Sequence, residues 1–294
     1  MLKGNIVALV TPFKSNNKVN YNKLIELIEY QIESKVSGIL LLGTTGEGAL
    51  LSLKEKLRII KLAIAVINGR VKLIIGCGDV NTLNAFKFVQ KIAKLDIDYL
   101  LVMTPFYIKT NDKGIVEHYK LISQASNIPI IIYHVPSRTG QTISINCLKE
   151  LKKIKNIRGI KEASGNIEYI KLIKKYIDDE FILLGGNDEL MVQVMENKGS
   201  GIISVLSNSH PLVVSEIMEL CLNNHYKDAN KILSKYIEYI KLLFIEPNPI
   251  PIKEVLNYLN YEVGNYRLPL CSISEDNKDK LIKELKEISK WMSY

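Results

Sequence analysis

Short runs of β-branched and other apolar residues recur along the first two thirds of the chain. Each run is followed by turn residues and then by a helical pattern. The runs are nearly continuous in hydrophobicity, which is typical of strands that are buried on both faces. They predict eight strands, at residues 6–10, 39–42, 72–76, 99–103, 130–133, 157–161, 182–184 and 202–205.

Segments with the period of an amphipathic helix lie between these runs. Residues 22–34 place Leu24 and Ile28 on one broad face, and residues 53–67 repeat the pattern with Ile60. Eight strand–helix units in succession predict an α/β protein with the fold of a (β/α)8 TIM barrel. A doubly wound parallel sheet is the alternative, but it gives no reason for eight similar units.

The strand signals stop near Pro211, and the rest of the chain is predicted to be helical. The sequence Glu-Pro-Asn-Pro-Ile-Pro at 246–251 predicts a rigid loop, because proline fixes the backbone angle φ. We expect a catalytic barrel at residues 1–224 and a C-terminal helical domain at residues 225–294. The helices predicted beyond Pro211 span residues 213–222, 226–245, 252–259 and 278–291.

Composition and charge exclude several classes of partner. Of the 294 residues, 47% are hydrophobic and 24% are charged, as is ordinary for a soluble globular protein. No stretch reaches the roughly 20 apolar residues that span a bilayer. Thr11 and Pro12 end the first apolar run too early for a signal peptide. The net charge is +8, but lysines alternate with glutamates and no nucleic-acid-binding motif is present. We expect binding to neither membranes nor nucleic acid.

The cysteines and histidines show no metal-binding pattern. The four cysteines, at positions 77, 147, 221 and 271, lack the CxxC spacing of a zinc site, and the four histidines are scattered. We therefore predict no metal site and no disulfide. Reduced cysteines are typical of a cytoplasmic protein, which is the location that we expect.

The active site of a (β/α)8 barrel lies at the carboxyl ends of its strands. Side chains alternate faces along a strand, so Gly159 and Lys161 share one face of the sixth predicted strand. If that face is the barrel interior, Lys161 is buried next to space left by a glycine. Burial favours a neutral amine, which can add to a ketone and form an imine. The alternative is a lysine that is paired with a carboxylate for structural reasons only.

Two residues near the end of the fifth predicted strand are further candidates. Tyr133 shares a face with Ile131 and could act as a general acid and base, or it could simply be a packed aromatic residue. Arg138, in the following loop, suits a substrate carboxylate because a guanidinium can form two parallel hydrogen bonds. An exposed surface arginine is the alternative.

The sequence Gly-Thr-Thr-Gly-Glu-Gly follows the second predicted strand at residues 43–48. Its glycines allow backbone N–H groups to approach an anion, and its threonines offer hydroxyl groups. The sequence does not match a nucleotide-binding P-loop.

These motifs together resemble the dihydrodipicolinate synthase branch of the N-acetylneuraminate lyase superfamily. The resemblance covers nearly the whole chain. It includes Thr11-Pro12, Gly-Thr-Thr-Gly-Glu at 43–47, Thr-Pro-Phe-Tyr at 104–107, Tyr-His-Val-Pro-Ser-Arg-Thr-Gly at 133–140, Gly-Ile-Lys-Glu-Ala-Ser-Gly at 159–165, Gly-Ile-Ile-Ser-Val at 201–205 and the proline-rich loop at 246–251.

The resemblance implies a set of roles. Lys161 would form an imine with pyruvate, with no added cofactor. Tyr133 would move protons together with Thr44 and with Tyr107, which in the family reaches in from a neighbouring subunit. Thr45 would hold the pyruvate carboxylate. Arg138 would hold the carboxylate of L-aspartate 4-semialdehyde. The remaining implied site residues, which would line the site through backbone atoms, are Gly186 and Ile203.

The implied reaction is the condensation of these two substrates to 4-hydroxy-tetrahydrodipicolinate, towards diaminopimelate and lysine, in a homo-oligomer that is a dimer or a dimer of dimers. Two alternatives stay open. One is a related pyruvate-dependent aldolase that acts on a sugar acid. Arg138 argues against it, because a polyol tail offers no second carboxylate. The other is a non-catalytic ligand-binding barrel, which the presence of Lys161 and Tyr133 disfavours.

Two departures from the family pattern are evident. His134 stands where the family usually has asparagine, and strand parity directs it away from the barrel centre. Members that respond to lysine resemble one another in their polar and acidic residues at the lysine site, and this chain largely lacks them. At those positions it has Gly48, Ala49, Leu53, Lys56, Val80, Asn84 and Phe106, of which only Ala49 fits.

Overall fold

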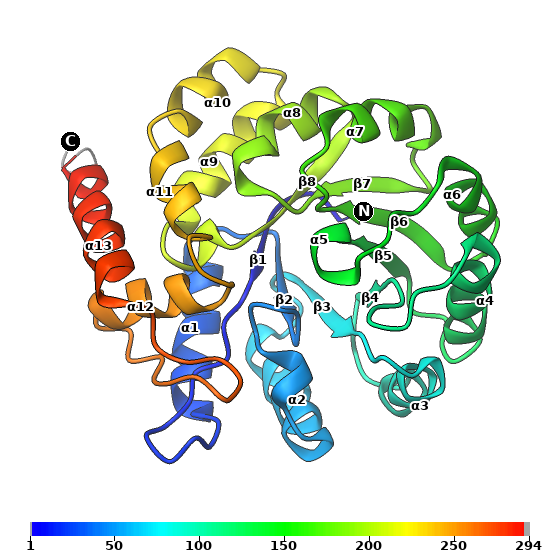
Figure 1. Ribbon diagram of the computed structural model, residues 1–294, viewed down its shortest axis with the longest axis horizontal. Coiled ribbons are helices and arrows are strands. Elements are labelled where there is room, and N and C mark those ends of the chain that lie inside the picture. Colours follow the sequence, from blue (N-terminus) through cyan, green and yellow to red (C-terminus); the bar gives the residue numbers. More distant parts are fainter. Residues whose placement is uncertain (1, 291–294) are drawn as a thin grey trace.

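The computed structural model describes residues 2–290 and contains a closed barrel of eight parallel strands, in which each strand pairs with the next and β8 pairs with β1 (Figure 1). This confirms the predicted fold. The strands are β1 (Gly4–Ala8), β2 (Gly38–Leu41), β3 (Lys72–Cys77), β4 (Tyr99–Met103), β5 (Ile130–His134), β6 (Ile157–Glu162), β7 (Ile182–Gly185) and β8 (Gly199–Ser204).

The helices form a ring outside the strands (Figure 1). Those that follow β1 to β7 are α1 (Tyr21–Glu33), α2 (Leu53–Ile67), α3 (Thr82–Ile92), α4 (Asp112–Ser123), α5 (Pro136–Thr139), α6 (Ile145–Lys152), α7 (Ile167–Ile173) and α8 (Met191–Glu196). Those that follow β8 are α9 (Pro211–Leu222), α10 (Tyr226–Leu233), α11 (Ile237–Leu242), α12 (Ile250–Tyr258) and α13 (Glu275–Ser289). Short 3-10 turns lie at Gly48–Leu50, Lys174–Tyr176, Asp188–Leu190 and Leu206–Asn208.

Local sequence explains where the helices begin. The Ser52 side chain accepts a hydrogen bond from the Glu55 backbone N–H, and the Glu55 carboxylate accepts one from the Ser52 N–H at 2.9 Å. This capping box satisfies two backbone donors that the first turn leaves unpaired. The α2 helix therefore begins at Leu53, after the 3-10 turn that follows the segment with the candidate threonines.

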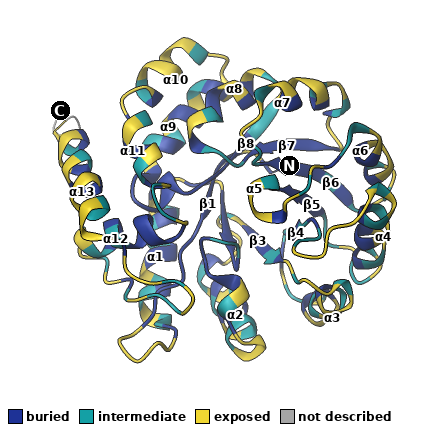
Figure 2. Cartoon of the chain, in the orientation of Figure 1, coloured by how far each residue is buried: buried dark blue, intermediate teal, exposed yellow. Residues whose placement is uncertain are grey.

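Two apolar layers make up the core. The larger lies between the strands and the surrounding helices, and the smaller fills the barrel interior with inward side chains such as Ile6, Leu40, Ile74 and Ile131. The burial pattern follows this arrangement, with buried strands and with helices that are exposed on their outer faces (Figure 2). The barrel is a packed core and not a pore.

The helical segment beyond β8 differs from the prediction in one respect. Residues 226–245 were expected to form one helix, but the chain forms α10 and α11 with a break at residues 234–236. At the break Tyr236 is buried and packs edge-on against His210, with 5.6 Å between the ring centroids. Tertiary packing thus overrides a continuous helical pattern.

The last helix, α13, packs against both α11 and α12 beside the barrel. The predicted boundary between residues 224 and 225 stays a prediction. The predicted end of the last helix, at Trp291, lies outside the described residues. No helix within residues 2–290 is both long and apolar enough to cross a membrane. The four cysteines are free thiols, three of them buried.

Candidate active site at the mouth of the barrel

A cavity of about 140 Å³ lies at the carboxyl ends of the strands. Six of the eight site residues predicted from the sequence line it. They come from four different strand ends or the loops that follow them: Thr44, Thr45, Tyr133, Arg138, Lys161 and Gly186. The structure therefore brings together residues that are far apart in the sequence.

Lys161 and Tyr133 face each other in this cavity. They are register partners on β6 and β5, and the Lys161 Nζ lies 4.5 Å from the centroid of the Tyr133 ring. Lys161 is 6% exposed and Tyr133 is 8% exposed. The predicted alternation of faces on β6 is confirmed, because Lys161 points into the barrel and not towards the helices.

Among residues 2–290, no carboxylate lies within ion-pair distance of the Lys161 Nζ. This argues against the interpretation of Lys161 as half of a structural salt bridge. Gly186 makes room for it, because a Cβ atom at Gly186 would stand 2.9 Å from Lys161 Cε. The barrel thus holds an unpaired amine in a space that larger residues would close.

The side chains on the outer faces of the same strand ends form a second pair. His134 and Glu162 are both fully buried, and the His134 Nδ1 is hydrogen-bonded to the Glu162 carboxylate. The Ile143 N–H donates to His134 Nε2 at 3.2 Å, and the Ser164 N–H donates to Glu162 at 2.6 Å. The prediction that His134 points away from the barrel centre is confirmed.

Asn248 is a site residue that sequence reasoning missed. It precedes α12 and lines the cavity, and its side-chain N–H donates to Thr45 Oγ1 at 2.9 Å. Its backbone carbonyl accepts a hydrogen bond from Arg138 at 3.3 Å. The proline-rich motif around it was recognised as a rigid loop, but nothing in its pattern signals a contact with residues about 110 and 200 positions earlier.

The end of β8 is fixed by another buried carboxylate. Asp188 accepts hydrogen bonds from the backbone N–H groups of Val205 and Leu206, at 3.0 and 2.9 Å. Burial raises the pKa of this carboxyl group, and those hydrogen bonds oppose the shift. Val205 lines the cavity beside Asn187. Within residues 2–290, no cluster of three or more His, Cys, Asp or Glu side chains could hold a metal ion.

Two predicted residues are not brought into the cavity. Ile203 belongs to the apolar barrel interior, and its proposed backbone contribution stays a prediction. Tyr107 is 84% exposed and has a φ angle of 64°. A positive φ is costly for a bulky residue and requires a stabilising environment. The single chain offers Tyr107 little contact.

A second, mostly apolar cavity of about 300 Å³ adjoins the first and shares Thr44, Tyr133 and Arg138 with it. It is also lined by Lys56 and Phe106. The Lys56 ammonium lies 5.5 Å from the Phe88 ring centroid.

Comparison with known proteins decides the family. The family model described as the dihydrodipicolinate synthetase family matches residues 1–288. The chain belongs to the dihydrodipicolinate synthetase family. It is 41% identical to 4-hydroxy-tetrahydrodipicolinate synthase 1 of Clostridium acetobutylicum over 97% of each chain.

Solved structures of the family have the same fold. The dihydrodipicolinate synthase of Aquifex aeolicus superposes with a TM-score of 0.95 at 36% identity, and the match covers 98% of each chain. A family member from Cyanidioschyzon merolae, solved with lysine bound, superposes with a TM-score of 0.94 at 30% identity over 98% of each chain.

We predict that lysine does not inhibit this family member. Lysine carries two ammonium groups and one carboxylate, whereas Lys56 presents a like charge, Asn84 lacks a carboxylate and Phe106 lacks a hydroxyl group. Hydrogen bonds to charged groups contribute about 1.5–3 kcal/mol each. Losing two or three of them weakens binding roughly a thousandfold.

The measurement is an initial-rate assay at saturating pyruvate with lysine raised to tens of millimolar, against a salt control of equal ionic strength. Half-inhibition below about 1 mM, the range of a working feedback site, would show that the chain binds lysine through other residues.

Proposed function

We propose that this chain catalyses the condensation of pyruvate with L-aspartate 4-semialdehyde to 4-hydroxy-tetrahydrodipicolinate, the first committed step towards diaminopimelate and lysine. One observation carries the proposal above the others: the unpaired Lys161 amine lies buried beside the Tyr133 ring in a cavity with two threonine hydroxyls. A neutral, sheltered amine is the group that imine formation with a 2-oxo acid requires.

The first half of the reaction uses the inward face of β6. The Lys161 Nζ adds to the pyruvate ketone, a proton moves to the former carbonyl oxygen, and water leaves to form the imine. Tyr133 is the proposed proton carrier for these transfers, because its ring lies against Nζ. Thr44 lines the same cavity and extends the proton path. Thr45, oriented by Asn248, holds the pyruvate carboxylate.

The second half joins the two substrates. Loss of a methyl proton converts the imine to an enamine, whose carbon attacks the aldehyde of the second substrate. The amino group of that substrate then displaces Lys161 and closes the ring. Arg138 is the proposed partner of its carboxylate. An aldolase that acts on a sugar acid is the alternative, but the polyol tail of such a substrate has no second carboxylate to pair with Arg138.

We place the chain in a homo-oligomer and in the cytoplasm. The strained, exposed Tyr107 supports the first, because a neighbouring subunit would cover it and receive its hydroxyl group. The free thiols support the second.

The imine is tested by adding pyruvate and borohydride and measuring the mass of the peptide that contains Lys161. We expect one reduced pyruvate adduct at Lys161. The Lys161→Arg variant should give none, because a guanidinium stays protonated. The control is a sample treated with borohydride alone, which should gain no mass. Label at a different lysine would refute the mechanism.

Arg138→Ala should still form the pyruvate adduct but should need more aldehyde. Arg138 is on the exposed side of the cavity, so we use the lower end of the range for a charge-assisted pair, about 2 kcal/mol. This corresponds to a rise of about thirtyfold in the KM for the aldehyde. Steady-state kinetics with both substrates provide the measurement.

The matched control for this substitution is Arg158→Ala. Arg158 lies near the start of β6 and forms an ion pair with Glu180. The control variant should leave both KM values unchanged. Equal increases for pyruvate and aldehyde in Arg138→Ala would argue against the proposed role.

Tyr107→Phe should lower turnover while leaving the fold and the assembly unchanged, because only the hydroxyl group is lost. General acid–base groups typically contribute about 10²–10⁴-fold. The assay is kcat together with sedimentation. Tyr258→Phe, at an exposed tyrosine on α12, is the control. A kcat within about twofold of the unmodified chain, far short of that range, would make Tyr107 a packing residue.

A further inference from the structure

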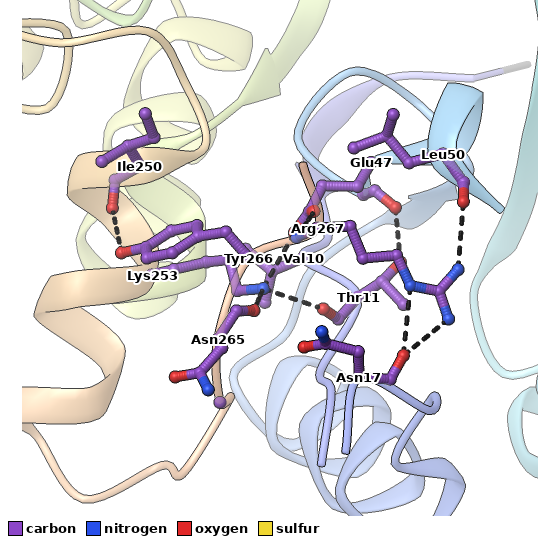
Figure 3. A network of polar contacts seen from close by, with 12 residues as sticks. Val10, Thr11, Asn17, Glu47, Leu50, Ile250, Lys253, Asn265, Tyr266 and Arg267 are labelled. Atoms are coloured by element: carbon purple, nitrogen blue, oxygen red, sulfur yellow. Dashed lines mark hydrogen bonds and ion pairs between the residues drawn. The ribbon is translucent and has the colours of Figure 1, made fainter. Parts of the chain in front are cut away.

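The loop that carries Thr44 and Thr45 is held from outside the barrel by a buried ion pair (Figure 3). Lys253 lies on α12, in the C-terminal segment, and its Nζ is 2.8 Å from Glu47 Oε1. Both side chains are 0% exposed. The pair therefore joins two segments that are more than 200 residues apart in the sequence.

Glu47 occupies the position that gives this loop its shape. Its φ angle is 52°, in the left-handed region, and its N–H donates to the Thr44 carbonyl at 3.0 Å. The Gly48 N–H donates to the Gly43 carbonyl at 3.1 Å. A left-handed conformation costs free energy for a residue with a side chain, and the contacts of the carboxylate offset part of that cost.

The Lys253 ammonium group has three hydrogen-bond acceptors around it. Besides Glu47, its ammonium donates to the Asn265 carbonyl at 2.5 Å and to the Thr11 carbonyl at 3.5 Å. It also lies 4.5 Å from the centroid of the Phe13 ring. Burial lowers the pKa of Lys253, and the adjacent Glu47 carboxylate opposes this shift.

Arg267 holds the far end of the same loop. Its guanidinium donates to both carboxylate oxygens of Glu55, at 3.0 and 2.5 Å, and to the Leu50 carbonyl at 3.0 Å. Its backbone N–H donates to the second oxygen of Glu47 at 3.3 Å. The Arg267 guanidinium lowers the pKa of Glu55 to about 2. The loop is thus fixed at Glu47 and at Leu50, both just beyond the threonines.

Stability alone does not account for a buried ion pair in this position. Desolvation of two charges commonly cancels their attraction, and well-packed hydrophobic residues are often as stable. What an apolar pair cannot supply is the directed set of hydrogen bonds that reaches Asn265, Thr11 and the Arg267 N–H.

We propose that Lys253 and Glu47 are positioning residues for the reaction: their buried pair fixes the turn at residues 43–48 so that Thr44 and Thr45 face the Lys161 amine. The proposal rests on the function proposed above. It gives the C-terminal segment a role in positioning the site, although that segment lines the cavity only through residues of its loops, Phe244 and Asn248. A displacement of about 1 Å in a positioned group can cost on the order of 10²-fold in rate.

The test separates stability from positioning. The variants are Lys253→Met, which leaves a buried carboxylate unpaired, and the double variant Glu47→Met with Lys253→Met, which removes both charges. The control is Lys278→Met, which breaks the partly exposed Lys278–Glu254 pair, also on the C-terminal segment. For each we measure the melting temperature, kcat, both KM values and the rate at which pyruvate and borohydride label Lys161.

We expect Lys253→Met to lower both the melting temperature and kcat. The double variant should recover most of the melting temperature, while its kcat and labelling rate stay lower by about tenfold or more, within the range expected for a misplaced group. Lys278→Met should leave kcat unchanged.

Recovery of kcat together with stability in the double variant would overturn the positioning role, and so would a kcat within about twofold of the unmodified chain in Lys253→Met. Failure of both variants to fold would overturn it too, because the pair would then be a requirement of the barrel itself. If the unmodified chain is not labelled at Lys161, the proposed function fails instead.

Discussion

An unpaired amine inside a packed barrel is the constraint on which the rest of this structure depends. Lys161 occupies an inward position of β6 where the barrel would otherwise hold an apolar side chain. Burying a charged group without a partner is costly, so this position is an unusual one for a lysine that serves only the fold. Gly186 provides space for the side chain, and the Tyr133 ring covers one side. A carboxylate partner would stabilise Lys161 but would also remove its nucleophilic character.

The surroundings of Lys161 show how a barrel can supply polar groups without introducing charge into its centre. The two threonines and Asn248 bring uncharged donors and acceptors to the cavity. The two nearby carboxylates have other hydrogen-bond partners. Glu162 is hydrogen-bonded to His134 on the outer face of the strands, and Asp188 accepts hydrogen bonds from the backbone beyond β8. Each is held by specific hydrogen bonds, and neither forms an ion pair with the Lys161 amine, although burial raises the pKa of Asp188 and the Lys161 charge acts to lower it.

The sequence predicted those features that depend on local pattern. Eight buried runs gave the strands to within about three residues, because two-sided burial leaves a continuous apolar signal. Alternation of side chains predicted that Lys161 shares a face with Gly159, which could be the barrel interior, and that His134 points away from the barrel centre. The resemblance to the family assigned roles to three further residues that line the cavity, Thr44, Thr45 and Gly186. By contrast, Lys253 and Arg267 carry no local signal, since charged residues in a helical or loop segment are most often solvated. Asn248 lies in the recognised proline-rich loop, but the pattern of that loop does not indicate its contacts with Thr45 and Arg138. Their importance arises only when α12 and the loop after it pack against residues 43–50.

The same reasoning explains why one substitution relative to the family pattern can be accommodated. His134 and Tyr133 are neighbours in the chain but lie on opposite faces of β5. The Ile143 N–H donates to His134 Nε2, so that nitrogen carries no proton, and Nδ1 donates to Glu162. The ring is therefore held in one tautomer by two partners on its own side of the sheet. Tyr133 and Lys161 are register partners, and His134 and Glu162 are the next pair along the two strands. The hydrogen bond on the outer face therefore joins the strand ends one residue beyond the proposed reacting groups. A change on the outer face can thus alter packing there while the inner face keeps its register, which is the separation that an alternating strand makes possible.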